Sequence, residues 1–471
     1  MAIINNPQTL DLNDIQGMVI RGYGKLYETA YFLLQINDAT QAKTWMKEIY
    51  PLIDSADVSS HAEKTLHLAF TPKGLSALGL KDKNVESFPV PFREGVVTDD
   101  RSRILGDYGE NAPSKWRWGA NDDKLHLTLI FHAKDKPALE VFLEEEKNRI
   151  NKIGGVTIIN EIKAHLRKDN KEPFGFHDGI SEPVIKGSGR PGPENDMVAT
   201  GEFLLGYKNE HNQYPYSPLL EADQGNSSML KDDAAGSGKK DLGHNGTFMV
   251  FRQMQQHVKE FWDFMDDKTK KEDGTIDKEA SKKLASKCVG RWPNGASLVL
   301  YPDAEPEGDF DNDDFGYAEK DPDGLRCPFG SHLRRNNPRD TFRWYNKEQS
   351  LKVTRRHRIM RRGRNYEIPT EGDKSEIGLC FICFNTNIEL QFEFIQHAWS
   401  NDNQPTHLSN DIDVIIGVPP EGNPNNDKGQ FTIQAEPVNQ YIDNWKRFVT
   451  IKGGEYFFFP SLSVINYLTT I

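Results

Sequence analysis

One acidic residue, Asp178, stands in the segment "PFGFHDGISEP" (residues 173–183), next to His177 and between two glycines. The segment has almost no helix or strand pattern, and glycine permits tight turns that other residues resist. A carboxylate held on such bare backbone raises the question of what chemistry it serves. Asp178 is therefore the first residue to which we assign possible chemistry.

Two later segments concentrate other reactive side chains. His332 lies in "CPFGSHLRRNNPRDTFRW" (327–344), where Pro328 and Pro338 limit any helix to about two turns. This polar, arginine-rich stretch cannot be a core strand, which makes its imidazole a candidate ligand. The third segment, "RRHRIMRRGRNYE" (355–367), could bind an anion or merely solvate a loop.

Together the three segments resemble one family, the dye-decolorizing peroxidases, which are haem enzymes built from two ferredoxin-like domains. "GFHDG" (175–179) is similar to the G-x-x-D-G signature of that family, "HLRRNNPR" (332–339) to its haem-ligand segment and "RIMRRG" (358–363) to its distal arginine segment. The three follow one another in the same order along the chain. Lesser matches extend the resemblance over nearly the whole sequence, and the length and long loops resemble the larger members.

The resemblance implies a haem b cofactor with His332 as the proximal iron ligand. The other ring nitrogen of His332 should donate to an acid, which stabilises high-valent iron. Glu389 is the candidate for that acid and Glu393 the substitute, and the motif does not separate them. Asn337 and Arg339 are expected to organise the ligand loop and to meet a haem propionate.

On the other face of the haem, the resemblance assigns peroxide activation to Asp178 and Arg361. Asp178 would move a proton between the two peroxide oxygens, and Arg361 would stabilise the developing negative charge. An ordinary aspartate is a weak base at neutral pH, so an acidic optimum is expected unless burial raises its pKa. The residues that follow it are expected to lie close to the porphyrin edge: Gly179, Ile180 and Ser181.

Two neighbours of these residues leave alternatives open. Arg362 is expected to face solvent, although a shift of one residue between Arg361 and Arg362 remains possible. His177 abuts Asp178, but the family motif leaves its position free, so we expect it behind the acid or at the surface. Its protonation could still tune Asp178 electrostatically.

The expected function is reduction of hydrogen peroxide and one-electron oxidation of bulky phenols or dyes through an oxoferryl intermediate. Large dyes cannot enter a closed haem pocket and would react through surface tyrosine or tryptophan radicals. One alternative is a haem-handling protein that uses iron as cargo, and this alternative needs His332 but not Asp178 and Arg361 together. Another is a related chlorite-decomposing enzyme, which lacks the catalytic aspartate.

The elements that must position these residues follow an α+β pattern. Strand-like segments at 29–36, 64–70, 124–133 and 156–167 alternate with helical segments at 39–53 and 136–150. The second half repeats this alternation. It has a predicted strand at 245–254, a helix at 255–265, a strand at "GLCFICF" and a helix at 388–399. We therefore predict two ferredoxin-like domains, residues 1–215 and 216–471, with antiparallel sheets covered by helices.

Composition excludes several classes of partner. The 58 basic and 70 acidic residues give a net charge of −12, which disfavours nucleic acid and anionic membranes. No run approaches a membrane span, and "MAIINNPQTLDLNDIQG" lacks the pattern of a secretory signal, so a cytoplasmic location is expected. The oligomeric state and the physiological reductant are not readable from the sequence.

Three further patterns resemble motifs but fail on context. Cys380 and Cys383 form C-x-x-C inside an apolar strand, where residues three apart point to opposite faces, so two packed thiols are predicted. "GSGRPG" (187–192) matches a dinucleotide fingerprint, but its prolines prevent a following helix, so a turn is predicted. The loop "DFDNDDFG" (309–316) lacks the glycine and final acid of a calcium loop and is predicted to be solvated.

Overall fold

The computed structural model describes residues 9–57, 63–120, 123–342, 345–370, 375–403, 408–418 and 429–471. The first half contains a four-stranded antiparallel sheet in the order β4-β1-β3-β2. Its elements follow the βαββαβ order of a ferredoxin-like unit: β1 (Glu28–Ile36), α1 (Ala39–Ile49), β2 (Lys64–Phe70), β3 (Leu127–Ala133), α6 (Lys136–Ile153) and β4 (Val156–His165). The predicted strands and helices of this half are confirmed. Four short helices connect β2 to β3: α2 (Pro72–Leu78), α3 (Asp82–Val85), α4 (Val90–Glu94) and α5 (Asp99–Leu105).

The second half repeats the same strand arrangement, in the order β11-β12-β9-β15. Its elements are β9 (Thr247–Gln256), α7 (Val258–Lys268), β11 (Arg364–Pro369), β12 (Ser375–Asn385), two π-helical turns (Glu389–Glu393 and Ile395–Ser400) and β15 (Val449–Phe459). The helix predicted at 388–399 is therefore present but more widely wound than an α-helix. The boundary predicted between residues 215 and 216 stays a prediction.

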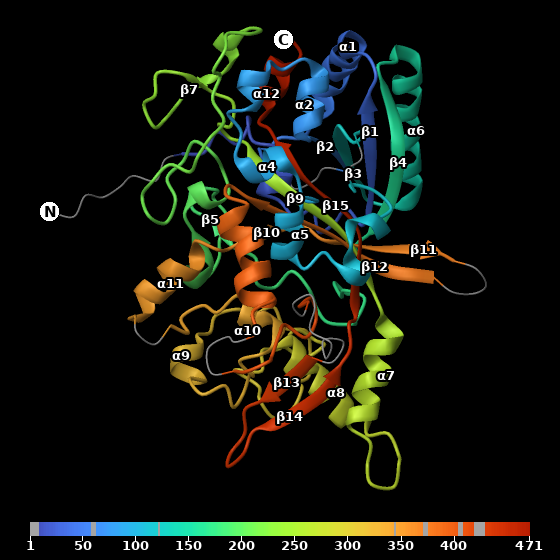
Figure 1. Cartoon of the computed structure of the whole chain (residues 1–471), viewed down its shortest axis with the longest axis vertical. Helices are drawn as coiled ribbons and strands as arrows, with labels where there is room; N and C mark the ends of the chain where they lie inside the picture. The colour runs from blue at the N-terminus through green and yellow to red at the C-terminus, as the bar shows by residue number, and fades with distance from the viewer. Residues whose placement is uncertain are drawn as a thin grey trace, which may run out of the picture.

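The two sheets join at both edges. β15 pairs with β2 at Phe458 and Phe70, and β11 pairs with β4 at Asn365 and His165. The eight long strands in the described part of the chain therefore close into a barrel (Figure 1). Closure removes exposed sheet edges.

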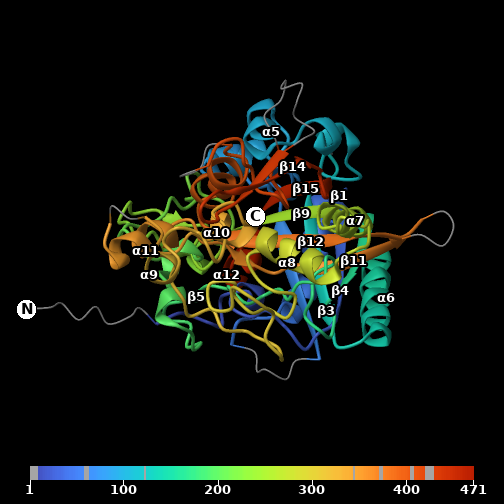
Figure 2. The same cartoon turned by 90° about the horizontal axis from the view of Figure 1, so that it is seen from below.

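Alternation along the strands separates two cores. In β1, Phe32 and Leu34 pack on the helix side with Trp45 of α1, whereas Tyr31 and Leu33 pack inside the barrel with Phe251 and its neighbours. This is the period of two that a strand imposes. The helices cover the outside of the sheet, as Figure 2 shows for α6 beside β4.

The two cysteines of β12 follow the same rule. Cys380 belongs to the core inside the barrel and Cys383 to the core on the helix side, and both are free thiols. The prediction of two packed thiols on opposite faces is confirmed. Burial raises the pKa of both, which keeps them protonated.

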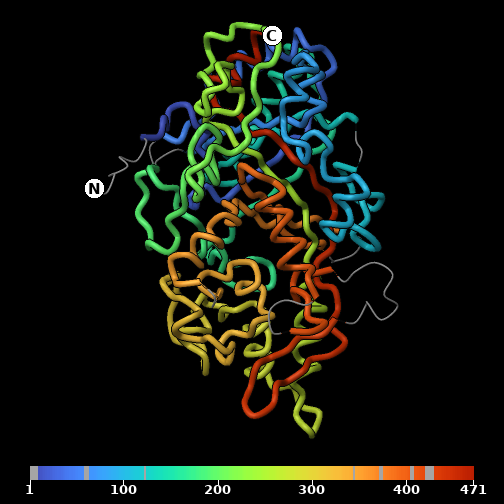
Figure 3. The backbone as a smooth tube through the Cα atoms, turned by 60° about the vertical axis from the view of Figure 1, so that its left-hand side comes forward, coloured from blue at the N-terminus to red at the C-terminus, as the bar shows by residue number. Residues whose placement is uncertain are grey.

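A smaller lobe lies below the barrel in Figures 1 and 3 and consists mostly of long loops between strands. It is built from segments between β9 and β15 and carries His332. No helix within the described ranges is both long and apolar enough to cross a membrane. The remaining elements are β5 (Val184–Ile185), β6 (Met197–Val198), β7 (Lys231–Asp232), β8 (Lys240–Asp241), α8 (Lys278–Val289), α9 (Tyr317–Lys320), α10 (His332–Asn336), α11 (Lys347–Arg355), β10 (Met360–Arg361), β13 (Gly429–Ile433), β14 (Gln440–Trp445) and α12 (Leu462–Leu468).

Candidate active site

Asp178 and Arg361 face each other although 183 residues separate them. Asp178 lies in the loop between β4 and β5, and Arg361 ends the short strand β10. Nη1 of Arg361 lies 3.7 Å from Oδ1 of Asp178, and the same oxygen accepts the N–H of Gly179 at 2.7 Å. No partner of Oδ2 is found among the described residues, so this oxygen is available to a small molecule.

The loop that carries Asp178 is held from inside by Glu172. The carboxylate of Glu172 accepts the backbone N–H groups of Phe174 and Phe176 at 3.0 Å and the amide of Gln256 at 2.8 Å. Gly175 turns the chain at a φ of +99°, a value that favours glycine. Burial raises the pKa of Glu172 to about 7. Sequence reasoning missed this residue, because nothing local marks an acid that caps its own loop.

Arg361 is fixed by Glu182. One carboxylate oxygen of Glu182 accepts from Nε at 2.9 Å and Nη2 at 2.8 Å, and the other accepts the backbone N–H at 3.0 Å. Burial by itself lowers the pKa of Arg361, but Glu182 and Asp178 raise it above its ordinary value. The guanidinium therefore stays charged and is aimed at Asp178.

Arg362 points away from Asp178. Its Nε and Nη2 donate to the carbonyls of Met18 and Val19 at 2.8 and 3.0 Å. Of the two arginines, Arg361 is the one that lies beside Asp178, which favours it as the distal arginine. The expectation that Arg362 faces solvent is wrong, since its side chain is 6% exposed.

His332 begins α10 and is oriented by an acid from a distant loop. Its Nδ1 lies 2.8 Å from a carboxylate oxygen of Asp413, which also accepts from the amide of Asn336. Burial by itself raises the pKa of Asp413, but His332 and the N–H of Ile416 lower it to about 2. Asp413 is therefore ionised and accepts a hydrogen bond from Nδ1–H of His332, which leaves the lone pair of the imidazole on Nε2.

The expectation that Glu389 or Glu393 supports His332 is wrong. Both carboxylates bind Arg101 of α5, Glu393 at 2.5 Å and Glu389 at 3.4 Å. The π-helical turns that carry them face α5. Asp413 was not found from the sequence because its loop reaches His332 only after the chain has passed through the intervening segments.

A cavity of about 200 Å³ brings the three chemistry-bearing residues together. Asp178 and Arg361 contribute to its wall, and so does His332. Most of the remaining wall is apolar: Phe174, Phe176, Leu379, Phe381, Phe392, Ile415 and Ile416. One imidazole with a free Nε2, apolar walls and no competing ligand cluster in the described residues form a donor set that suits haem iron.

The other predicted residues divide into two groups. Gly179 and Ile180 line a second, larger cavity that adjoins Asp178. Ser181, Asn337 and Arg339 line neither cavity. Arg339 donates to the carbonyls of Asp313 and Phe315, so it anchors the ligand loop, and its contact with a haem propionate stays a prediction.

Two more expectations need correction. The loop 309–316 is not simply solvated, because Asp313 is 4% exposed and binds the guanidinium groups of Arg291 and Arg339. His177 lines both cavities beside Asp178, closer to the site than expected. Its backbone N–H donates to the carbonyl of Pro293 at 3.2 Å.

Comparison with known proteins points to one family. A family model described as "DyP dimeric alpha+beta barrel domain" matches residues 14–168. The chain is 30% identical to Peroxidase 2 of Mycetinis scorodonius, over 97% of this chain and 87% of the relative. It is 28% identical to the dye-decolorizing peroxidase AauDyP1 of Auricularia auricula-judae, with the same coverage of both chains.

Solved structures agree. An ancestral D-type dye-decolorizing peroxidase superimposes with a TM-score of 0.77 at 27% identity, covering 98% of this chain and 100% of its own. A dye-decolorizing peroxidase in complex with 2,6-dimethoxyphenol gives a TM-score of 0.77 at 26% identity, with the same coverage. The members of this family are haem enzymes. The chain therefore belongs to the dye-decolorizing peroxidase family and is a peroxidase.

Proposed function

We propose that this peroxidase uses haem b, with His332 as the axial ligand and Asp178 and Arg361 as the groups that handle hydrogen peroxide. The observation that carries the proposal is the convergence of these three residues on one apolar cavity. Bound haem would supply the redox chemistry. Peroxide accepts two electrons through it, and two reductant molecules replace these electrons one at a time. Glu172, Glu182 and Asp413 act on the three residues as supports.

Asp178 moves the proton. Its Oδ2 takes a proton from one peroxide oxygen and returns it to the other, so that the leaving oxygen departs as water. Arg361 lies beside it with its charge fixed by Glu182, and this charge stabilises the negative charge that develops during cleavage. The balanced reaction consumes one hydrogen peroxide and two reductant molecules, each of which loses one electron and one proton, and forms two waters and two radicals.

The reductants are phenols and dye-like aromatic compounds. One relative was solved with 2,6-dimethoxyphenol, which supports phenols as a class. Dyes too large for the cavities give up electrons at exposed tyrosine or tryptophan side chains. Tyr216, Tyr345 and Tyr441 are exposed, at 62, 49 and 56%.

The test is the absorption spectrum of the haem-loaded protein before and after one equivalent of hydrogen peroxide. Wild type should change its spectrum within milliseconds, and Asp178→Asn should keep the resting spectrum while this change slows by about 100-fold or more. Asp169→Asn is the matched control, because Asp169 lies in the same loop but pairs with Arg167 at the surface. Full turnover in Asp178→Asn would refute the role of Asp178, and a fast reaction with chlorite instead of peroxide would refute the proposed reaction.

A further inference from the structure

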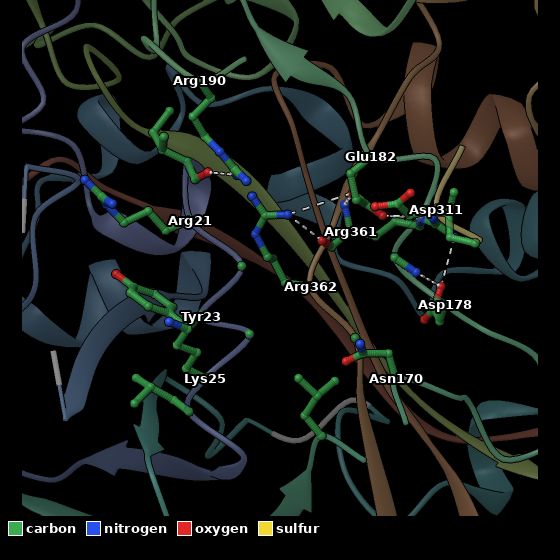
Figure 4. A pocket seen from close by; sticks show the side chains of 18 of the residues that line it. Arg21, Tyr23, Lys25, Asn170, Asp178, Glu182, Arg190, Asp311, Arg361 and Arg362 are labelled. Atoms are coloured by element: carbon green, nitrogen blue, oxygen red, sulfur yellow. Dashed lines mark hydrogen bonds and ion pairs between the residues drawn. The ribbon is translucent and has the colours of Figure 1, made fainter. Parts of the chain in front are cut away.

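A second cavity, of about 790 Å³, adjoins the first at Asp178 and Arg361. We call it the basic chamber. One end is formed by Asp178, Glu182 and Arg361, and the other by the loop of residues 21–25 and the "GSGRPG" turn, which brings in Arg190. Figure 4 shows Arg21, Tyr23 and Lys25 on one side of the chamber and Asp178 and Asp311 on the other, with Arg362 between them.

The chamber has a surplus of positive charge. Its described lining includes six cations, Arg21, Lys25, Arg190, Arg361, Arg362 and Arg364, against three carboxylates, Asp178, Glu182 and Asp311. Two of the carboxylates, Asp178 and Glu182, are engaged by Arg361. The positive charge that remains therefore lies at the end away from Asp178.

The cations at that end are held by carbonyl groups. Nε of Arg21 donates to the carbonyl of Ala56 at 2.8 Å, and Nη1 of Arg190 donates to the carbonyl of Ile20 at 2.7 Å. Within the described residues, no carboxylate lies within 4 Å of the charged groups of Arg21, Lys25 or Arg190. Arg21 and Arg190 are thus held in place, and none of the three charges is neutralised, so they can receive an anion without first breaking an ion pair.

Two of these six cations, Arg362 and Arg364, are buried. Nε of Arg364 is buried and has no hydrogen-bond partner within the described residues. Burial and the nearby Arg190 and Arg364 lower the pKa of Arg362 to about 10, against the opposing effect of Glu182. An anion in the chamber would favour the charged form of Arg362.

The wall between the two ends is apolar and of the right size for one aromatic ring with substituents. It is formed by Ile20, Leu26, Leu166 and Ile180, together with Tyr23. A volume of about 790 Å³ falls within the roughly 300–1,000 Å³ of small-molecule sites. The chamber thus combines an apolar middle with a cationic end.

We propose that the basic chamber binds phenolic carboxylates as reductants. The carboxylate is received by Arg21, Lys25 and Arg190, and the phenol lies toward Asp178 and Arg361. This inference rests on the proposed function and names its substrate class. Each phenol gives up one electron and its hydroxyl proton, and two phenoxyl radicals leave for every peroxide reduced to two waters.

The experiment uses the haem-loaded protein with 4-hydroxybenzoate and its methyl ester, a pair that differs in charge at neutral pH. In wild type the KM for the acid should be lower than that for the ester. Arg21→Gln/Arg190→Gln should raise the KM for the acid by about tenfold and bring the two values together. Lys25→Gln tests the charge alone, because Lys25 makes no hydrogen bond or ion pair with the described residues, and should raise the KM for the acid about threefold.

Lys259→Gln is the control, since the side chain of Lys259 is 81% exposed on α7, outside the chamber. It should leave both KM values unchanged. Equal KM values for acid and ester in wild type, or a ratio that the chamber variants do not change, would overturn the inference. If the protein oxidises neither compound with peroxide, the proposed function fails. Calorimetric titration of 4-hydroxybenzoate then tests the binding site separately. Binding that Arg21→Gln/Arg190→Gln abolishes supports the site, and no binding to wild type overturns it.

Discussion

His332 and Asp413 are joined by a hydrogen bond of 2.8 Å between Nδ1 and a carboxylate oxygen, across 81 residues of chain. The side chain of Asp413 is fully buried, and its pKa is held at about 2, so the partner of the imidazole is a charge. A charged partner gives the ring more anionic character than a carbonyl would, and this stabilises oxidised iron.

Asp413→Asn should keep haem bound but raise its reduction potential. Asparagine can still accept from Nδ1–H through its amide oxygen, so the change removes the charge more than the geometry. Potentiometric titration should show a higher midpoint, and peroxidase activity should fall by about 10- to 100-fold. Asp411→Asn is the control, because Asp411 is also buried but binds Thr432. An unchanged midpoint in Asp413→Asn would show that Asp413 does not tune the iron.

Glu182→Gln should slow the reaction with peroxide by roughly 10- to 100-fold, because Arg361 loses the carboxylate that fixes its position. The rate of the spectral change after mixing with peroxide measures this effect. Glu194→Gln is the control, because Glu194 is exposed, and this variant should react like wild type. A rate equal to that of wild type in Glu182→Gln would mean that Arg361 needs no positioning.

Glu393→Gln should destabilise the protein without changing the haem ligand. Glu393 is 3% exposed and makes the shortest and most buried ion pair of Arg101, so its neutralisation leaves this nearly buried guanidinium with only the longer contacts to the more exposed Glu94 and Glu389. The free energy of unfolding should fall by roughly 3 kcal/mol, measured by chemical denaturation. Glu389→Gln should cost less than about 1 kcal/mol, because Glu389 is half exposed. A changed axial-ligand spectrum in Glu393→Gln would restore it as a support of His332.

The pH dependence of stability should carry a contribution from Glu172. Burial raises its pKa from 4.5 to about 7, so between these values the folded state holds a proton that the unfolded chain has lost. The stabilising contribution is complete below about pH 4.5 and is lost as the pH rises through about 7, on the order of 3 kcal/mol in total.

Glu172→Gln removes this titration and should flatten the fall in the free energy of unfolding between pH 4.5 and 7. Denaturation at several pH values measures the slope. Glu279→Gln is the comparison, because Glu279 is 84% exposed and should leave the slope as in wild type. Identical slopes in Glu172→Gln and wild type would contradict the raised pKa.

The sequence by itself determined the elements and the three local segments that carry Asp178, His332 and Arg361. Strand alternation and helical spacing depend on neighbours within a few residues, so the four strands of the first sheet, β9 and β12 of the second, and the opposite faces of Cys380 and Cys383 could be predicted from pattern alone. The turn at Asp178 was readable for the same reason, since its glycines are adjacent to it.

Tertiary structure decided the partners. Asp413 reaches His332, Glu182 holds Arg361 beside Asp178, and Glu393 binds Arg101 instead of the imidazole. Each of these contacts depends on the path of a long loop or on the register of a strand. The spacing of neighbouring residues in the sequence predicts neither of these. The basic chamber has the same origin, because the "GSGRPG" turn faces residues 21–25 only once the barrel has closed.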